Sequence, residues 1–480
     1  MQRKLFASIT AMAASFAWLA APGAPADAAT CQNGPAGDLN GDGVPEIVIG
    51  VPGAEGAKGA VTIVDGRTKR AERFTAASLG FQPNERRERF GTAVLVTDVT
   101  GDGCSELIVG APNAAKGAGR VYVAQGTPSG LSNKPLATID SPDRGAEFGT
   151  ALSISFVNGD RKGLLIGGPG YDDGKATSAG AVYTVNLDTA NGGIDKPYRY
   201  TQNSPDIEGV SESHDMFGLV LSGPFVGVPM EDVGSARDAG AFVRLAMHPE
   251  GSVAFGEAVT QNSKGVSNTA ESGDRFGMSL FARHSYIAVG APGEDDGRIV
   301  DAGAAHVFWT DNSAEPYVYQ QEAWFVTQNS PGIPGVSEKG DAFGSSVALG
   351  EVTPGESRRN LWIGADGEDV GSVRDAGSVT RLDDGSGLPA ATLTLGNGLP
   401  GKAKSGDALG AALGTVGDTG DRVFGADSLL IGVPGRDVDS VADSGWVIWS
   451  AYGSTKLPES AGIKDRPAAG EAVGTVFGAA

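Results

Sequence analysis

The sequence predicts an all-β protein, a seven-bladed β-propeller whose last blade is closed by both termini. Three observations favour this fold. Two series of glycine motifs alternate along the chain with seven members each, and their period is roughly 60 to 70 residues, enough for a four-stranded unit. Short apolar runs are separated by Gly and Asp turns, and helical periodicity is weak beyond the N-terminal segment.

The first series is a Phe-Gly pair, whose aromatic ring we expect in the core. Its members are Phe90-Gly91, Phe148-Gly149, Phe217-Gly218, Phe276-Gly277, Phe343-Gly344, the variant Leu409-Gly410, and Phe477-Gly478. The second series is an apolar run that ends in Gly-x-Pro or a near match. Its members are Gly50-Val51-Pro52, Gly110-Ala111-Pro112, Gly168-Pro169, Gly227-Val228-Pro229, Gly290-Ala291-Pro292, Gly364-Ala365-Asp366 and Gly432-Val433-Pro434. Glycine suits inner strands that crowd near a propeller axis and turns that need positive φ.

The two series are out of phase at the ends of the chain. A Gly-x-Pro half-unit at residues 38–66 has no Phe-Gly before it, and the final Phe-Gly at residues 476–480 has no Gly-x-Pro after it. Joined together, the two ends make one complete unit. A closed ring of seven blades explains both half-units and removes the exposed sheet edges of an open array.

Composition and charge restrict the class of protein. Of 480 residues, 40% are hydrophobic, and Gly and Pro together number 100, which suits a large core rather than disorder, collagen or coiled coil. The formal net charge of −21 repels phosphate backbones, so we expect no nucleic-acid partner. Length alone would suggest about three domains, but a repeat array predicts a single propeller domain over residues 29–480.

The N-terminus has the pattern of a secretory signal peptide at residues 1–28. Arg3 and Lys4 precede a charge-free apolar run at residues 5–21, and Ala26-Asp27-Ala28 fits a small-x-small cleavage site. The alternative, an uncleaved membrane anchor, is disfavoured by the short run and by the prolines that follow it. No later stretch is apolar enough to span a bilayer, so we expect a secreted or cell-surface-associated protein.

The paired motifs carry a family resemblance. Phe90-Gly91 followed by Gly110-Ala111-Pro112, repeated along nearly the whole chain, resembles the FG-GAP repeat of the integrin α-chain N-terminal β-propeller and its bacterial secreted relatives. The resemblance implies an extracellular protein or glycan ligand on the loop-rich face. Propellers of this kind serve adhesion, sugar binding and, in some relatives, catalysis. We expect a monomer.

Two acidic loops are the most specific chemistry in the sequence. Residues 38–46 place the side-chain oxygens of Asp38, Asn40, Asp42 and Glu46 at loop positions 1, 3, 5 and 9, and Val44 offers its carbonyl at position 7. Calcium takes six to eight such oxygen ligands. The loop resembles the calcium-binding hairpin of FG-GAP repeats. The alternative is a turn that caps itself by Asx hydrogen bonds.

Residues 98–106 repeat the same frame. Asp98, Thr100, Asp102, Cys104 and Glu106 stand at the five ligand positions, with Thr100 a poorer ligand than Asn40 and Cys104 supplying a carbonyl. Calcium is therefore the expected cofactor, held at two loops in adjacent blades. The self-capped turn remains the alternative here too.

The chain has two cysteines, Cys31 just before the first acidic loop and Cys104 inside the second. An exported protein permits a disulfide between them, which would pin the start of the mature chain. The alternative is two free thiols.

A second acidic pattern follows the Gly-x-Pro turns. Its pairs, six residues apart, are Asp232 and Asp238, Asp295 and Asp301, Asp369 and Asp375, and Asp437 and Asp443, with Asp172 and Ser178 as a partial copy. One interpretation is a cation- or ligand-binding rim. The plainer one is that each Asp fixes its own turn.

Signs of catalysis are thin. Nucleophile-elbow, P-loop and zinc-protease motifs are absent from the sequence, and the four histidines have no ligand spacing. His214 beside Asp215, or His306 near Asp301, could be a base with an orienting acid, although a surface or turn histidine is the plainer interpretation. We therefore predict a binding or adhesion module without catalysis of its own. The alternatives are a lectin-like propeller, with Trp324, Trp362, Trp446 and Trp449 as candidate stacking residues, and a secreted hydrolase or polysaccharide lyase.

Overall fold

In the computed structural model, all the strands lie in the unit Cys31–Ala480. Within it the structure describes residues 31, 37–83, 87–158, 161–188, 193–248, 251–283, 285–310, 319–351, 359–383, 390–416, 428–437, 445–450 and 476–477. The predicted signal peptide lies outside these residues. Among the described residues, no helix is long and apolar enough to cross a membrane.

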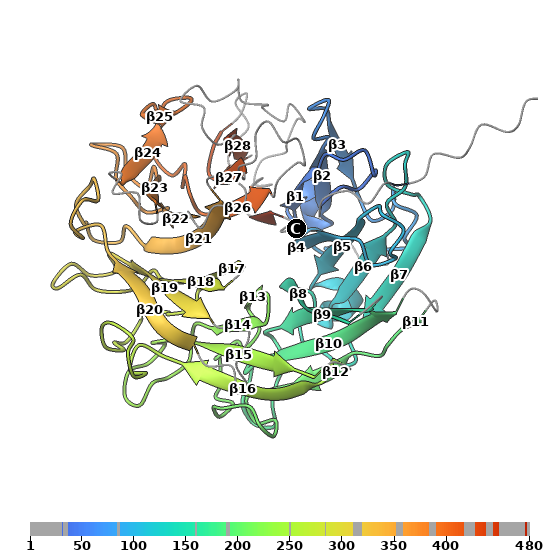
Figure 1. Ribbon diagram of the computed structural model, residues 1–480, viewed down its shortest axis with the longest axis horizontal. Coiled ribbons are helices and arrows are strands. Elements are labelled where there is room, and N and C mark those ends of the chain that lie inside the picture. Colours follow the sequence, from blue (N-terminus) through green and yellow to red (C-terminus); the bar gives the residue numbers. More distant parts are fainter. Residues whose placement is uncertain are drawn as a thin grey trace, which may run out of the picture. The chain divides into compact units, whose positions relative to one another are not determined.

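Seven mainly antiparallel sheets follow one another around a ring, which confirms the predicted seven-bladed propeller (Figure 1). Blade 1 contains β1 (Ile47–Val51), β2 (Ala60–Val64), β3 (Ala71–Phe74) and β29 (Val476–Phe477). Blade 2 contains β4 (Ala93–Thr97), β5 (Glu106–Ala111), β6 (Arg120–Ala124) and β7 (Pro135–Asp140). Blade 3 contains β8 (Leu152–Asn158), β9 (Arg161–Gly168), β10 (Ala181–Asp188), β11 (Gly193–Ile194) and β12 (Tyr198–Tyr200).

In the four remaining blades the strands are named from the inner to the outer strand. Blade 4 contains β13 (Val220–Ser222), β14 (Phe225–Val228), β15 (Ala241–Met247) and β16 (Val253–Val259). Blade 5 contains β17 (Ser279–Arg283), β18 (Tyr286–Ala291), β19 (Ala304–Thr310) and β20 (Tyr319–Val326). Blade 6 contains β21 (Phe343–Glu351), β22 (Arg359–Ala365), β23 (Ser378–Asp383), β24 (Ala391–Leu395) and β25 (Gly398–Leu399). Blade 7 contains β26 (Leu413–Val416), β27 (Ser428–Val433) and β28 (Trp446–Ser450).

The ring is closed by strands from opposite ends of the chain. In blade 1, β29 pairs antiparallel with β1, with Val476 opposite Gly50 and Phe477 opposite Ile49. This pairing joins the two half-units in the way that their sequences predict. It also covers the edge of β1 that would otherwise lack a partner.

Glycine allows consecutive blades to approach backbone to backbone. Gly119, just before β6, forms a parallel bridge with Phe148, and a Cβ at Gly119 would lie 2.2 Å from the Phe148 carbonyl oxygen. Gly110 of blade 2 meets Gly149 of blade 3 in the same manner, with its Cβ position 1.9 Å from the Gly149 oxygen. Both glycine series therefore exist because any side chain there would separate the blades.

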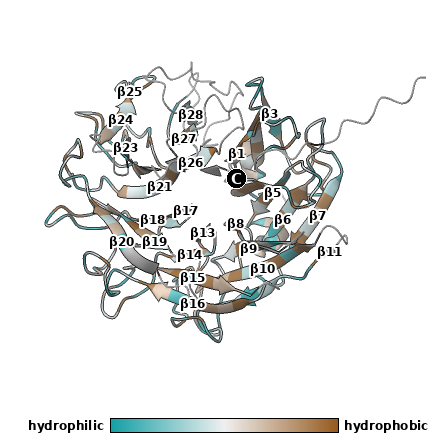
Figure 2. Cartoon of the chain, in the orientation of Figure 1, coloured by the Kyte–Doolittle hydropathy of each residue, from teal (hydrophilic) through white to brown (hydrophobic). Residues whose placement is uncertain are grey.

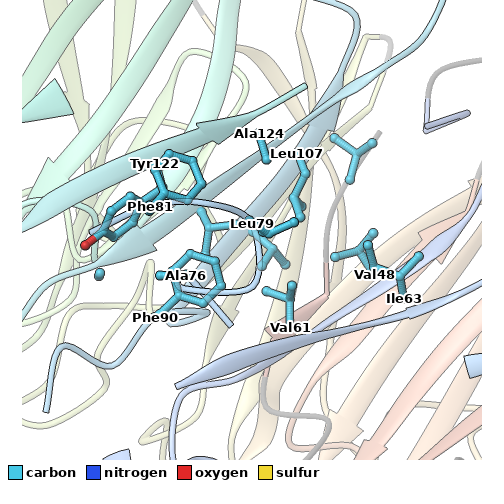
Figure 3. Packing of buried hydrophobic residues seen from close by; sticks show 14 of the residues in the cluster. Val48, Val61, Ile63, Ala76, Leu79, Phe81, Phe90, Leu107, Tyr122 and Ala124 are labelled. Atoms are coloured by element: carbon cyan, nitrogen blue, oxygen red, sulfur yellow. The ribbon is translucent and has the colours of Figure 1, made fainter. Parts of the chain in front are cut away.

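The hydrophobic core is divided among the seven interfaces between neighbouring blades. In the first interface, Phe81 and Phe90 contact Tyr122, with ring centroids 4.7 and 5.5 Å apart (Figure 3). The last interface packs Val416, Leu430 and Val447 of blade 7 against blade 1. Figure 2 shows the hydrophobic residues on strands such as β10 and β15. The Phe of each described Phe-Gly pair in the interior is buried, as expected: Phe90, Phe148, Phe217, Phe276 and Phe343.

Two four-residue turns, α1 (Ala54–Ala57) and α2 (Ala114–Gly117), follow the Gly-x-Pro motifs of blades 1 and 2. Each contains three residues with positive φ, for example Ala115 at 52° and Lys116 at 61°, so neither is a regular helix. The candidate stacking tryptophans lie in the blade interfaces: Trp362 is buried, and Trp324, Trp446 and Trp449 pack as half-buried residues against core clusters. All four therefore contribute to packing between blades.

Candidate metal centre

The first acidic loop precedes β1 and wraps around the carboxylate of Asp38. The Asp38 side chain is fully buried, and Oδ1 accepts hydrogen bonds from the backbone N–H of Gly41 at 2.7 Å and of Asp42 at 3.2 Å. Its Oδ2 accepts from the Gly43 N–H at 2.7 Å. Positive φ at Gly41 and Gly43 lets these amides turn inward. The loop therefore surrounds one buried carboxylate with backbone N–H donors.

Glu46 closes the loop from the start of the first strand. Its Oε2 accepts from the Leu39 N–H at 2.7 Å, and its Oε1 accepts from the Asn40 Nδ2 at 2.8 Å. Ligand oxygens of Asp38, Asp42 and Glu46 lie within 4.8 Å of one another. The structure thus brings together the three carboxylates that the sequence singles out, at a spacing that one cation can bridge.

The second acidic loop joins β4 to β5 and repeats three of these contacts. Asp98 Oδ1 accepts from the Gly101 N–H at 2.7 Å, and Oδ2 accepts from the Gly103 N–H at 3.1 Å. Glu106 Oε2 accepts from the Val99 N–H at 2.9 Å. Among the residues that the structure describes, however, this loop lacks the grouping of three carboxylates within 4.8 Å that the first loop has.

The two loops lie side by side and are tied together. The Ser105 N–H of the second loop donates to the Asp38 carbonyl of the first at 2.7 Å. Cys31 and Cys104 form the predicted disulfide, with their Cα atoms 5.3 Å apart. Asp102 also lies near both sulfur atoms, but sulfurs joined in a disulfide are not thiolate ligands, so this group is not a metal site.

Burial and crowding make both closing glutamates hard to ionise. Desolvation, reinforced by the charges of Asp38 and Asp42, raises the pKa of Glu46 to about 8. Desolvation, with the charges of Asp102 and Asp98, raises the pKa of Glu106 to about 7. Each closing glutamate therefore holds its proton more tightly than a glutamate in water does.

One basic side chain already contacts the first loop. Arg67, in the turn between β2 and β3, donates from Nε to Asp42 Oδ2 at 2.9 Å and from Nη2 to the Asp42 carbonyl at 2.6 Å. The guanidinium occupies the open side of the loop, where Asp42 is exposed. A metal ion would have to share or replace this contact.

The second acidic pattern fixes turns, which is the plainer of its two interpretations. The first Asp of each pair accepts a hydrogen bond from the backbone N–H six residues later: Asp238 to Asp232 at 2.9 Å, Asp301 to Asp295 at 3.0 Å, and Asp375 to Asp369 at 2.9 Å. The later residue adopts positive φ, which Asp tolerates. Ser178 repeats this contact with Asp172 at 2.8 Å. Asp443 lies outside the described residues.

His214 is an exposed residue in a turn, as the plainer interpretation expects, whereas His306 fits neither interpretation. His306 is fully buried, so it is neither a surface histidine nor a base that faces solvent. Its partner is Glu322 rather than Asp301, with Nδ1 and Oε1 2.6 Å apart. Phe276 and Phe325 pack against the ring at centroid distances of 5.0 and 4.9 Å. His284 lies outside the described residues.

Sequence reasoning also missed a cavity between blades 3 and 4. It has a volume of about 530 Å³ and is lined by Tyr198, Tyr200, Asp195, Arg199 and Asp206, among others. Tyr198 is 64% exposed, with its ring 4.9 Å from that of Tyr200. The alternating tyrosines of β12 were the available signal, since alternation places them on one face of a strand.

Comparison with known proteins agrees with this fold. A family model described as FG-GAP repeat matches residues 33–64 and 90–124, and a second FG-GAP repeat model matches residues 259–308. Phosphatidylinositol-glycan-specific phospholipase D of Bos taurus is 35% identical over 150 residues, which is 28% of this chain and 18% of that protein. Integrin alpha-PS5 of Drosophila melanogaster is 33% identical over 141 residues, 28% of this chain and 13% of that protein.

A further relative, integrin alpha-PS2 of Drosophila melanogaster, is 28% identical over 198 residues, 39% of this chain and 13% of that protein. The chain therefore spans less than a fifth of the length of these relatives, and the likeness to the phospholipase is confined to that part of it. Repeats, blade count and relatives agree: this protein is a β-propeller with FG-GAP repeats that resembles the N-terminal propeller of integrin α-chains.

Proposed function

We propose that the protein is a secreted, calcium-binding propeller that acts as a binding or adhesion module for an extracellular protein or glycan, without catalysis of its own. The observation that carries the calcium assignment is the grouping of Asp38, Asp42 and Glu46 within 4.8 Å. Two unit charges at that separation repel by roughly 3 kcal/mol at an effective dielectric constant near 20. A calcium ion among these oxygens turns that repulsion into attraction.

The placement of the loops suggests what calcium does for the module. Both loops lie where blade 1 meets blade 2, close to the disulfide and to the closure of the ring. An ion that binds only the folded loops stabilises the folded chain by mass action. Calcium would therefore hold the adjacent loop surface in one conformation for a ligand.

Thermal unfolding in calcium chloride and in EGTA tests the calcium assignment. We expect EGTA to lower the melting temperature of the natural protein by clearly more than it lowers that of a D38A/D98A variant, which lacks both loop sites. Asp172→Ala is the matched control, because it removes a turn-fixing aspartate outside both loops. Equal melting curves for the natural protein with and without calcium would show that the loops are ordinary self-capped turns.

A screen of extracellular-matrix proteins and a glycan array, each with calcium or EGTA, tests the module itself. Adhesion predicts calcium-dependent binding to a protein film that D38A/D98A loses. Release of product from a polysaccharide or lipid panel, abolished by a single substitution, would instead favour the secreted-hydrolase or lyase alternative. The name of the phospholipase relatives motivates including that panel.

The cavity beside Tyr198 favours a glycan as the second candidate ligand. An exposed tyrosine ring can stack on the apolar face of a sugar, and the neighbouring Asp195 and Asp206 carboxylates can accept hydrogen bonds from hydroxyl groups. Tyr198→Ala should abolish glycan-array hits. Trp309→Ala, an exposed aromatic outside the cavity, should leave them unchanged. Loss of hits in neither variant would exclude this cavity as the glycan site.

A further inference from the structure

Three consecutive blade junctions contain the same buried acidic group, outside both predicted calcium loops. Each group consists of a glutamine, an aspartate and a glutamate, and we call these groups the acidic junctions. They are Gln202, Asp215 and Glu231; Gln261, Asp274 and Glu294; and Gln328, Asp341 and Glu368. Every glutamine and aspartate among them is at most 3% exposed, and Glu294 is 1% exposed.

Repeated sequence positions build these junctions. The glutamine belongs to the Thr-Gln-Asn-Ser turn that leaves the outer strand of one blade, and the aspartate stands two residues before the next Phe-Gly or its equivalent. The glutamate follows the Gly-x-Pro motif of that next blade. Each acidic junction therefore joins the end of one blade to the loop of the following one.

The junction at Glu294 shows the contacts most completely. Gln261 Nε2 donates to Glu294 Oε2 at 2.6 Å, and Asn268 Nδ2 donates to Glu294 Oε1. The Asp274 carboxylate accepts from the Glu271 N–H at 2.6 Å, and the backbone carbonyl oxygen of Asp274 accepts from the Gly293 N–H at 3.1 Å. Glu294 and Asp274 are thus held in place by amide donors, with no basic side chain among these contacts.

In each acidic junction, the side-chain amide oxygen of the glutamine has no hydrogen-bond partner. The amide oxygen of Gln261 is buried and has no hydrogen-bond partner, although the nitrogen of the same amide bonds to Glu294. Gln202 and Gln328 repeat this arrangement, bonding through nitrogen to Glu231 and Glu368 with their oxygens unpartnered. A buried acceptor without a donor costs free energy, and the same cost occurs at three junctions.

The corresponding junction of blade 7 contains a basic residue in place of an acidic one. Its Gly-Val-Pro-Gly-Arg-Asp segment places Arg436 where the acidic junctions have glutamate. Arg436 Nη1 donates to Asp407 Oδ2 at 2.8 Å and to the Lys402 carbonyl at 2.8 Å. Asp407 is the equivalent of Asp274, so where the glutamate is absent a cation occupies the junction.

We propose that each acidic junction binds one hard divalent cation through its glutamate and aspartate carboxylates and its glutamine carbonyl oxygen. Calcium is the cation used to test this proposal. Two carboxylates and an amide oxygen are the ligand types that calcium prefers, and a double positive charge balances both carboxylates. The bound ion clamps one blade to the next. Blades 4, 5 and 6 each bind such an ion at the junction with the preceding blade, and in blade 7 the guanidinium of Arg436 takes the place of the ion.

Burial agrees with this assignment. Desolvation, reinforced by the neighbouring Asp274 charge, raises the pKa of Glu294 to about 8. Desolvation is also the largest cause that raises the pKa of Asp274 to about 7. Carboxylates that must share a buried junction without a counter-charge respond in this way.

Calorimetric titration of calcium into the full chain tests the proposal in the D38A/D98A background, where the two loops are disabled. We expect residual binding, and we expect Glu294→Arg, which copies the blade 7 junction, to remove one equivalent of it. Glu294→Gln removes one charge with little change of shape and should weaken the same site if Glu294→Arg fails to fold. Asp172→Ala, which removes a turn-fixing aspartate outside the three acidic junctions, is the matched control.

Two results would overturn the proposal: no calcium binding in D38A/D98A, or the same number of equivalents after Glu294→Arg and Glu294→Gln. A melting temperature that responds to pH and not to calcium in that background would assign the junctions to protons instead, which also overturns it. The test is separate from that of the loops, since loss of the loop sites leaves the junction equivalents in place.

Discussion

The buried pair of His306 and Glu322 allows a stability prediction that can be worked out from its contacts. The two side chains are 0% and 7% exposed, with Nδ1 and Oε1 2.6 Å apart, and Glu322 Oε2 also accepts from the Ser267 N–H at 2.7 Å. Removing one member of a buried pair leaves the other without its partner in a medium that solvates it poorly. Such a loss costs about 3–5 kcal/mol.

We therefore expect Glu322→Ala and His306→Phe each to lower the free energy of unfolding by about 3–5 kcal/mol. The double variant H306F/E322L should lose less than either single variant, because an apolar pair suits the rings of Phe276 and Phe325 around it. Urea unfolding followed by circular dichroism measures each value. Single variants that cost less than about 1 kcal/mol, or a double variant that is the sum of both, would refute this reasoning.

Three further predictions concern the backbone, the disulfide and pH. Gly303→Val should lower the melting temperature strongly, because a Cβ there would lie 2.2 Å from the Phe343 carbonyl oxygen, whereas Gly297→Ala, with open space around it, should have only the modest effect of its positive φ. Cys31→Ser opens a link spanning 73 residues and should destabilise the fold by about 4 kcal/mol on the chain-entropy model, measured by urea unfolding; no change would contradict the closed link. In EGTA the melting temperature should fall as the pH rises from 4.5, the ordinary pKa of Glu294, to its folded pKa of about 8. The reason is that the folded chain holds that proton more tightly than the unfolded chain does. Glu294→Gln should make this fall less steep, and a melting temperature that rises over this pH range would contradict the prediction.

The fold was predictable because its repeats encode geometry that only glycine and a buried aromatic satisfy. Gly110 and Gly149 are required by a backbone contact between blades, so the two motif series report the blades directly. The unmatched half-units at the two ends predicted the closure that β29 and β1 form. The disulfide was predictable because the sequence had already placed both cysteines beside neighbouring loops.

The candidate site was predictable only in part. The spacing of Asp38, Asp42 and Glu46 along one loop predicted a local cluster, and the structure brings these side chains together. The partner of His306 could not be read from the sequence, because Glu322 reaches it through strand pairing between β19 and β20. The acidic junctions were missed for the same reason: Gln261 and Glu294 are 33 residues apart and belong to different blades.

Arg67 is a feature that composition and spacing could not have suggested. It is 25 residues from Asp42 and reaches the first loop from the turn after β2. Because calcium must compete with this guanidinium, Arg67→Ala should strengthen calcium binding at the first loop, measured by calorimetry. Weaker binding in this variant would show that Arg67 helps to form the site.

A crystal grown in calcium chloride can show whether the loop around Asp38 holds calcium, as we propose. Long-wavelength diffraction data locate calcium by its anomalous scattering. We predict an anomalous peak among the oxygens of Asp38, Asp42 and Glu46, with the Val44 carbonyl turned toward it. A well-ordered loop without such a peak, with Asp38 bonded only to its own backbone amides, would contradict the account.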